Sequence, residues 1–281
     1  MNELIMLLFV AVVGYVAYMS KGGNYFLTKS NNKMSLGLSY GATLISTSAI
    51  IGFGGLAGWI GYAVPLTMFI PFIALIYFAT VYIGPKVWEA NQTIEAKTYI
   101  ELIGKYFNSP MLSKLLAIIT VGLIPFYCVA VLVGVGKFIT TVTGLDFTLA
   151  VVGFSVVVFG TIVYGGMASV VKNDMVQGLV VILGSVIVLS ITLFTHMQVD
   201  NFWENLAGAW TAVPEGDTLY KLGFTSFTSW PEFWSRGWLM ITTLLVFTIP
   251  VGLITLPQLQ TRWMMAKDKD SFKTIARWGV I

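Results

Sequence analysis

The feature that most constrains the fold is a stretch of 52 residues without a charged side chain, Met34–Pro85. A membrane-spanning helix needs about 20 mostly apolar residues, so this stretch fits two helices, and we place their turn near Gly61 to Pro65. The whole chain agrees, since 57% of its 281 residues are hydrophobic and only 10% are charged, against about a quarter in soluble domains. That composition excludes a soluble enzyme or a disordered chain. A net charge of +3 without a basic cluster argues against nucleic acid as a partner. The sequence predicts an all-α integral membrane protein.

Apolar stretches predict about seven membrane spans in all. Besides the two within the uncharged stretch, the spans are Leu4–Ser20, Leu115–Gly136, Phe147–Val171, Met175–His196 and Gly237–Leu256. The first span begins so near Met1 that a signal peptide is the competing interpretation, but no basic residue precedes it, which favours a retained helix. The last residues, Trp278 to Ile281, resemble the opening of a further helix.

The distribution of basic residues predicts the orientation. With the N-terminus outside, loops 20–34, 85–114, 165–174 and 257–278 are cytoplasmic and hold 13 of the 16 Lys and Arg residues, leaving Lys137, Lys221 and Arg236 outside. Because basic residues concentrate in cytoplasmic loops, we predict a multi-pass cell-membrane protein with this orientation. Five tryptophans of the outer region fit interfacial anchoring, with an aromatic substrate cage as the alternative: Trp203, Trp210, Trp230, Trp234 and Trp238.

The second span has a composition that weakens a regular helix. Four hydroxyl residues fall within positions 43–48, and three glycines fall within positions 52–55. Glycine disfavours a helix by about 1 kcal/mol relative to alanine, and Ser and Thr side chains can bond to backbone groups. Unwound backbone at membrane depth is tolerated where it is buried or lines a wet cavity, and its oxygens suit a small alkali cation. The alternative is close packing between helices, for which small residues such as Gly54, Gly55, Ala57 and Gly58 suffice.

The seventh span contains a second candidate interruption. Thr248-Ile249-Pro250-Val251-Gly252 lies in its middle, and Thr255-Leu256-Pro257 lies near its inner end. Proline removes a backbone donor and clashes with the preceding turn, so a simple kink is one interpretation. Two interrupted spans separated by four intact ones are also the pattern of an inverted five-helix repeat, in which the first helix of each half is discontinuous.

Residues that could perform chemistry are scarce. No acid, lysine or arginine lies at the centre of a predicted span, and the single histidine, His196, lies at the outer end of span six. The sequence therefore lacks the ionisable groups of a proton relay at membrane depth. It also lacks the phosphate-binding loop that coupling to ATP would need. The single cysteine, Cys128, is interpreted as a small buried side chain. We expect no enzyme and no cofactor, and an ion gradient as the energy source of any active transport.

Three stretches carry a family resemblance. Ser35–Gly61 has Ile51-Gly52 followed by a glycine-rich run, and Gly165–Gln177 combines Gly-Gly, Ala, Asp and Gln. Pro257–Lys267 reads PQLQTRWMMAK. In order and spacing these resemble the first core helix, the junction of core helices four and five, and the segment after core helix six of the sodium:solute symporters. That family includes bacterial carriers of proline, pantothenate and galactose.

The resemblance implies a leucine-transporter-type inverted-repeat core preceded by one extra helix. The extra helix would be residues 1–20, and residues 35–281 would hold core helices one to six and the start of the seventh. The chain would then be a single transmembrane domain, 1–281, corresponding to the N-terminal portion of a longer symporter.

The resemblance also implies where the ligands bind. Sodium, the coupling ion, would be held by the backbone carbonyls of Ala42 and Ile45, with further ligands from core helix eight beyond this chain. The predicted solute-binding residues are Ser46, Ser48, Ala49, Leu253 and Thr255. Asp174 would lie on the cytoplasmic exit path of sodium, and capping of a helix N-terminus is its alternative role.

The function expected from the resemblance is sodium-coupled uptake of a small organic solute, of the organic acid or amino acid class, by alternating access. The expected partners are the solute, sodium and the lipid bilayer, and no nucleic acid. The alternatives are a symporter-like membrane sensor module and an inactive truncated remnant.

Overall fold

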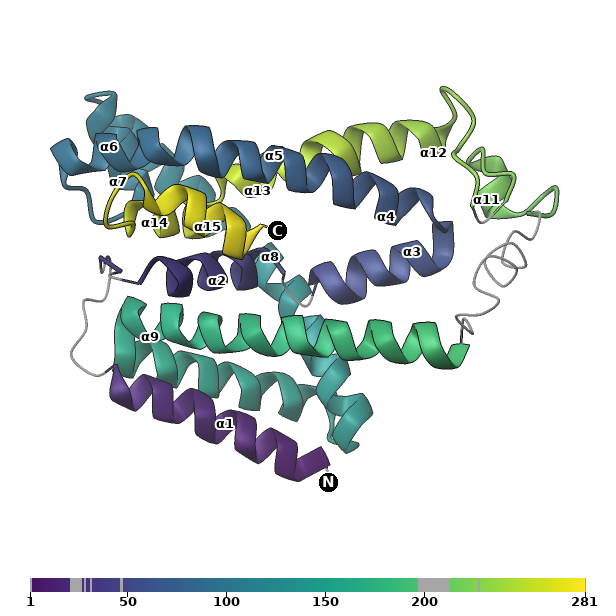
Figure 1. The fold of residues 1–281 in the computed structure, drawn as a ribbon, viewed down its shortest axis with the longest axis horizontal. Helices are drawn as coiled ribbons and strands as arrows, with labels where there is room; N and C mark the ends of the chain where they lie inside the picture. Colours follow the sequence, from purple (N-terminus) through teal and green to yellow (C-terminus); the bar gives the residue numbers. More distant parts are fainter. Residues whose placement is uncertain are drawn as a thin grey trace. The chain divides into compact units, whose positions relative to one another are not determined.

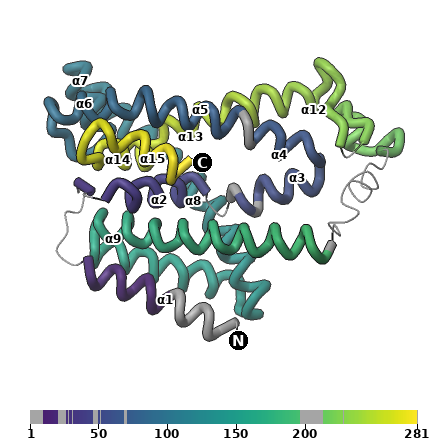
Figure 2. The backbone as a smooth tube through the Cα atoms, in the orientation of Figure 1, coloured from purple at the N-terminus to yellow at the C-terminus, as the bar shows by residue number. Residues whose placement is uncertain are grey.

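The computed structural model describes residues 2–20, 27, 29–30, 32–45, 48–196, 213–226 and 228–280. All regular elements in these ranges are helices, several of them of the wider π type (Figures 1 and 2). The chain divides into two compact units. The first unit comprises Met1–Ala49, Ala79–Gly178 and Leu256–Ile281, and the second comprises Ile50–Phe78 and Leu179–Thr255.

The first unit is built around the short helices α2 and α14. Its elements are α1 (Asn2–Met19), α2 (Lys33–Leu44), η3 (Ala79–Ile83), α6 (Gly84–Ile94), α7 (Tyr99–Tyr106), α8 (Pro110–Thr143), the first part of α9 (Phe147–Ile191), α14 (Pro257–Met264) and α15 (Ser271–Gly279). The Asn32 side chain caps α2 by accepting from Met34 N and Ser35 N. Large side chains of α2 and α14 are buried together, with the rings of Tyr40 and Trp263 stacked at 6.1 Å.

The second unit has its own apolar core. Its elements are η1 (Ser48–Phe53, from Ile50), α3 (Gly54–Ile60), α4 (Ala63–Thr67), η2 (Met68–Phe72), α5 (Ile73–Phe78), the end of α9, η4 (Thr192–His196), α11 (Thr218–Lys221), α12 (Arg236–Leu239), η6 (Met240–Thr248) and α13 (Ile249–Thr255). Ile60, Val64, Phe224, Ile241 and Leu245 are all buried in one cluster. Through Phe224, the segment after α11 packs against the helix that begins at Arg236.

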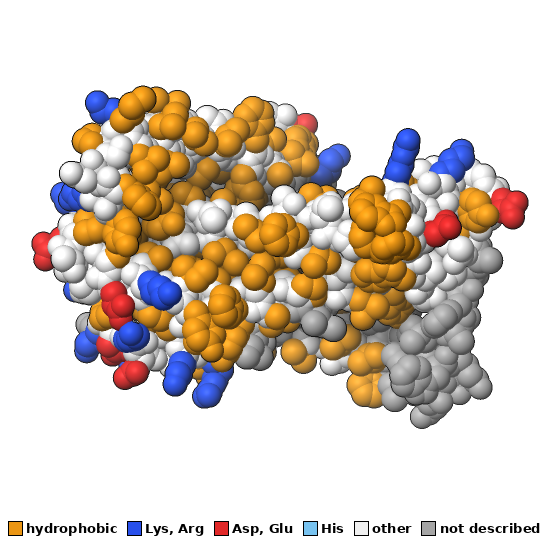
Figure 3. Space-filling model, turned by 90° about the horizontal axis from the view of Figure 1, so that it is seen from above, with side chains coloured by type: hydrophobic (Ala, Val, Ile, Leu, Met, Phe, Trp, Pro, Cys, Tyr) orange, Lys and Arg blue, Asp and Glu red, His pale blue; other side chains and the backbone are white. Residues whose placement is uncertain are grey.

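Among the described residues, three helical stretches are long and apolar enough to cross a bilayer: Pro110–Thr143, Phe147–Thr195 and Arg236–Thr255. Large apolar side chains of α8 are exposed on the surface of the structure. Val121 and Phe126, for example, are each 75% exposed. Hydrophobic side chains also cover much of the face in Figure 3. Cys128 is exposed on α8, so its interpretation as a buried side chain was wrong. The other predicted spans are composed of shorter helices.

Spans five and six are joined by a sharp turn at Gly166. The backbone of α9 is helical apart from this residue, whose φ of 56° and ψ of −156° lie outside the helical region. Its neighbour Gly165 lies against α1, because an added Cβ would be 3.1 Å from the Ala17 carbonyl oxygen. The predicted loop 165–174 is therefore wrong in extent, since the helix resumes directly after Gly166.

The predicted interruption of span two is present. Helix α2 ends at Leu44, Ile45 adopts φ −87° and ψ 81°, and helical structure resumes at Ser48. The turn predicted near Gly61 to Pro65 is also present, with Gly61 at φ 92° between α3 and α4.

The predicted interruption at Thr248–Gly252 of span seven is wrong. The chain stays helical from η6 through α13, and the Ile249 N–H bonds to the Leu244 carbonyl, five residues back. This wider π-helical turn accommodates Pro250, which would clash with the carbonyl four residues earlier in a regular helix. The non-helical residue is Leu256, at φ −63° and ψ 129°, directly before Pro257.

The four segments predicted on one side of the membrane contact one another in the first unit. Ser30 N donates to Met265 O (2.9 Å), Lys33 pairs with Asp268 (2.9 Å) and Lys269 pairs with Glu89 (2.6 Å). Segment 165–174 joins them through the Asp174–Arg262 ion pair. Segments 85–114 and 257–278 are largely helical and hold α6, α7, α14 and α15.

Candidate functional site

The broken end of α2 is held by direct backbone contact with α15. An added Cβ on Gly41 would lie 2.9 Å from the Gly279 carbonyl oxygen, and one on Gly37 would lie 3.2 Å from Ile275 Cα. Contacts this short leave no room for a side chain, so glycine at these positions allows the two helices to touch. Gly178 of α9 also lies close to α2, since an added Cβ on Gly178 would be 3.1 Å from the Leu38 carbonyl oxygen.

The interruption of α2 falls close to the two residues whose carbonyls the family resemblance assigns to sodium, Ala42 and Ile45. Ile45 N donates to Gly41 O at 2.9 Å as the cap of the helix. The last carbonyls of a helix have no partner within it, and Ala42 belongs to this set while Ile45 follows it. The carbonyl end of a helix also carries a partial negative charge that favours a cation. That the carbonyls of both residues bind sodium stays a prediction.

The predicted solute-binding residues fall into both units. Ser48 and Ala49 begin η1 in the first unit, and Ser46 lies outside the described residues. Leu253 is half-buried in α13 of the second unit, and the exposed Thr255 donates from its hydroxyl to Gly252 O at 2.8 Å. That these two groups face each other across one binding site stays a prediction.

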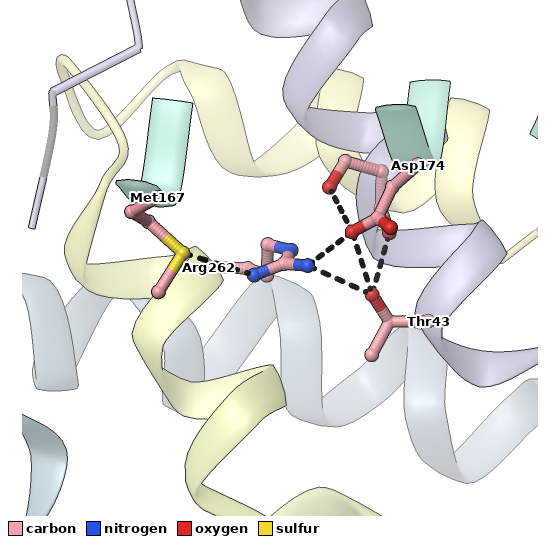
Figure 4. Close-up of polar contacts among 5 residues, drawn as sticks. Thr43, Met167, Asp174 and Arg262 are labelled. Atoms are coloured by element: carbon pink, nitrogen blue, oxygen red, sulfur yellow. Dashed lines mark hydrogen bonds and ion pairs between the residues drawn. The ribbon is translucent and has the colours of Figure 1, made fainter. Parts of the chain in front are cut away.

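Asp174 belongs to a cluster of polar side chains that joins three helices of the first unit (Figure 4). We call Ser39, Thr43, Asp174 and Arg262 the carboxylate cluster. Arg262 of α14 forms an ion pair with Asp174 Oδ2. The Ser39 hydroxyl of α2 donates to the same oxygen at 3.2 Å.

Thr43 completes the carboxylate cluster two residues before the interruption. Its hydroxyl donates to Ser39 O at 2.8 Å and accepts from Arg262 Nη2 at 3.1 Å. The other terminal nitrogen of Arg262 points to Met167 Sδ at 3.8 Å, as Figure 4 shows. The guanidinium therefore bridges α14 to the end of α2 and to both ends of the α9 segment Met167–Asp174.

The two charged side chains of this cluster are largely shielded from solvent, which makes their pairing important for stability. The Arg262 side chain is 4% exposed and that of Asp174 is 20% exposed. A buried charge is strongly unfavourable unless it is paired and hydrogen-bonded, so each of these two residues requires the other. The cluster can hold α2, α9 and α14 together while the two charges remain paired, and it presents a carboxylate beside the interrupted helix.

Asp174 does not cap a helix. The helix resumes at Met167, so Asp174 lies two turns inside it, beyond the first turn in which the helix dipole favours an acid. Its partners Ser39, Thr43 and Arg262 were not among the predicted site residues. In the sequence, Arg262 belongs to the PQLQTRWMMAK stretch and is one of several basic residues of a predicted cytoplasmic segment.

The rest of that stretch is accounted for by packing. Trp263, Met264, Met265 and Ala266 are all buried. An added Cβ on Gly84 would lie 3.3 Å from the Trp263 ring, and the Ala266 carbonyl accepts from Trp88 Nε1 at 2.7 Å. The stretch therefore anchors α14 in the first unit so that Arg262 reaches the carboxylate cluster.

Apolar helices of spanning length, one of the shorter helices being interrupted beside a buried ion pair, are features of a helical membrane protein. The chain belongs to the sodium:solute symporter family, whose model matches residues 25–280.

One curated relative is the uncharacterized symporter YwcA of Bacillus subtilis, to which the chain is 24% identical over 289 aligned positions. The alignment covers 98% of this chain and 52% of that protein, so the chain spans about half the length of its relative. No solved structure matches the chain.

Proposed function

We propose that this chain works in sodium-coupled uptake of a small organic solute, of the organic acid or amino acid class, by alternating access. The observation that carries the proposal is the interruption of α2 after Leu44, within an uncharged stretch of a chain of the symporter family. Unwound backbone at membrane depth is expected where it binds substrate or ion.

In this proposal the carbonyls of Ala42 and Ile45 contribute to the sodium site. The proposed solute-binding residues are Ser46, Ser48 and Ala49, which follow the same interruption in the chain, together with Leu253 and Thr255. Bound sodium orders the backbone at the interruption, and the solute contacts that same backbone. Each ligand therefore strengthens the binding of the other, which is the free-energy coupling that symport requires.

Asp174 serves as a stepping point for sodium on the way to the cytoplasm. The support is its position in the carboxylate cluster, bonded to Ser39 one turn before the helix end that carries Ala42. The orientation places the N-terminus outside the cell membrane, because the four segments rich in Lys and Arg then face the cytoplasm.

Uptake into proteoliposomes tests the proposal. The protein expressed from its own gene is reconstituted, and a panel of labelled amino acids and organic acids is offered under an inward sodium gradient or an equal potassium gradient. We expect at least one solute to accumulate with sodium alone. Equal uptake under both gradients for every accumulated solute would contradict sodium coupling.

A matched pair of substitutions tests the proposed sodium ligands. Ala42→Leu places a bulky side chain at the end of α2, so the sodium concentration for half-maximal uptake should rise several-fold. Ala130→Leu makes the same change at an exposed position of α8 and should leave that concentration unchanged. If Ala42→Leu keeps the wild-type sodium dependence, the ligand assignment is wrong.

A further inference from the structure

The short connection between α7 and α8 forms a fixed corner on the first unit. We call residues Lys105 to Lys114 the α7–α8 corner. Gly104 lies so close to α8 that an added Cβ would be 2.5 Å from Ser113 Cβ. Ser109 N donates to Gly104 O at 2.8 Å, and Asn108 takes the left-handed conformation at φ 47°. These bonds hold the corner in one shape.

The corner presents large apolar side chains that its own unit leaves uncovered. Tyr106 is 63% exposed, Phe107 is 64% exposed and Met111 is 80% exposed. The Tyr106 and Phe107 rings contact each other edge to face at 5.2 Å. Three exposed apolar side chains within six residues, two of them aromatic, indicate an interaction surface rather than a solvated tip.

Two lysines flank this apolar surface. Lys105 and Lys114 directly follow Gly104 and Ser113, the two residues at the contact between the helices, and both are exposed. Lys105 pairs with Glu101 at 2.7 Å, and this bond holds the pKa of Glu101 below its usual value. Glu101 is the single acid between Lys97 and Lys114, so the excess charge of the corner is positive.

The position of the corner along the chain sets its depth in the membrane. Helix α8 begins at the corner, and from Leu115 it carries no charge before Lys137. The corner therefore lies where an apolar span meets the headgroup layer. Aromatic rings favour that layer, and lysines there reach lipid phosphates while their methylene chains stay among apolar groups.

We propose that the α7–α8 corner is a docking surface for anionic phospholipid, with Tyr106, Phe107 and Met111 inserted among the acyl chains and Lys105 and Lys114 on the headgroup phosphates. Continuity with the lipid-facing surface of α8 and complementary charge favour this occupant. The proposal rests on the membrane placement within the proposed function and is independent of sodium coupling.

Fluorescence quenching by brominated lipids tests it. The single cysteine is removed by Cys128→Ser, Phe107→Cys is labelled with a small fluorophore, and the protein is reconstituted in phosphatidylcholine–phosphatidylglycerol vesicles in which one lipid or the other is brominated. We expect brominated phosphatidylglycerol to quench at least about twofold more strongly than brominated phosphatidylcholine at equal content. The double variant Lys105→Gln/Lys114→Gln should abolish that preference while quenching itself remains.

Val121→Cys in the same background is the matched control. Val121 is exposed in the middle of α8, so its label should be quenched equally by both lipids. Equal quenching at position 107 by the two lipids, or no quenching there, would overturn the proposal. Because this measurement needs no transport, its result is separable from a failure of sodium-driven uptake.

Discussion

Arg262 and Asp174 form the most deeply buried ion pair described in the structure. Folding of the first unit removes most of the water around each charge, since the two side chains are 4% and 20% exposed. The hydrogen bonds of Ser39 and Thr43 replace part of that hydration. Removing one member of such a pair leaves the other buried without a counter-charge, which costs about 3–5 kcal/mol.

Asp174→Ala should therefore destabilise the protein strongly. It strands the Arg262 guanidinium, so thermal unfolding in detergent should show a loss of about 3–5 kcal/mol. Lys269→Gln is the matched control, because it removes a pair whose side chains are 65% and 48% exposed, and such pairs contribute about 0–1 kcal/mol. Similar losses in both variants would show that the carboxylate cluster is not a buried structural pair.

At the residue scale the family resemblance singled out Asp174 but none of its partners, and the role of Asp174 on the sodium exit path stays a prediction. Asp174 stood in a recognisable stretch, whereas Arg262 lies 88 residues further along the chain and looked like one more basic loop residue. Sequence order could not show that α14 buries this residue, because the burial follows from the packing of Trp263 and its neighbours. A buried pair of this kind becomes visible only in three dimensions.

At the element scale, α2 depends on glycine. Gly37 and Gly41 are four residues apart and therefore lie on the same face of α2. Helix α15 packs directly on that face. Close packing of a small residue is thus found at Gly41, whereas an added Cβ on Gly54, Gly55 or Gly58, for which packing was the alternative interpretation, has no atom within 4 Å. The helix interruption follows Gly41 a few residues later. Packing and interruption belong to successive parts of one segment.

Gly41→Ala should lower stability because its methyl group would lie 2.9 Å from the Gly279 carbonyl oxygen. Backbone cannot move aside as a flexible side chain can, so α2 and α15 must separate, at a cost of about 1–3 kcal/mol. Gly122→Ala is the control, since no atom lies within 4 Å of the added Cβ. Thermal unfolding should leave this variant unchanged or raise its stability slightly, because alanine favours a helix. Equal behaviour of the two variants would refute the contact.

The two predicted helix interruptions, one in span two and one in span seven, differ in outcome for a physical reason. The hydroxyl-rich and glycine-rich segment of span two does interrupt its helix, after Leu44. Pro250 does not interrupt span seven, since the π-helical turns of η6 absorb it, and the interruption falls at Leu256. The residue before a proline avoids the helical region, which favours Leu256, but local sequence could not decide between Pro250 and Pro257.

At the scale of the whole molecule, the distribution of Lys and Arg predicts that four segments lie on the same side of the membrane, and contacts between these segments are consistent with that grouping. The segments predicted to share one side of the membrane, 20–34, 85–114, 165–174 and 257–278, contact one another in the first unit. Charge counting could group these segments, but it could not show that two of them are packed helices. Their cytoplasmic location remains part of the proposed function.

Cysteine labelling in intact cells tests that orientation. In the Cys128→Ser background, Glu215→Cys should react with a membrane-impermeant maleimide added outside, and Lys269→Cys should react only after the membrane is opened. Both residues are exposed, so access to the reagent decides the reaction. Labelling of position 269 in intact cells, with protection of position 215, would reverse the predicted topology.

The most direct test of the central claim is hydrogen exchange across the interrupted helix. The account predicts that amides of residues 41–49 in the protein expressed from its own gene exchange more slowly in sodium than in potassium at equal ionic strength. Sodium bound by the Ala42 and Ile45 carbonyls would order this backbone, while α8 should exchange identically in both salts. Identical exchange of residues 41–49 in sodium and potassium would contradict the claim that the interruption binds the coupling ion.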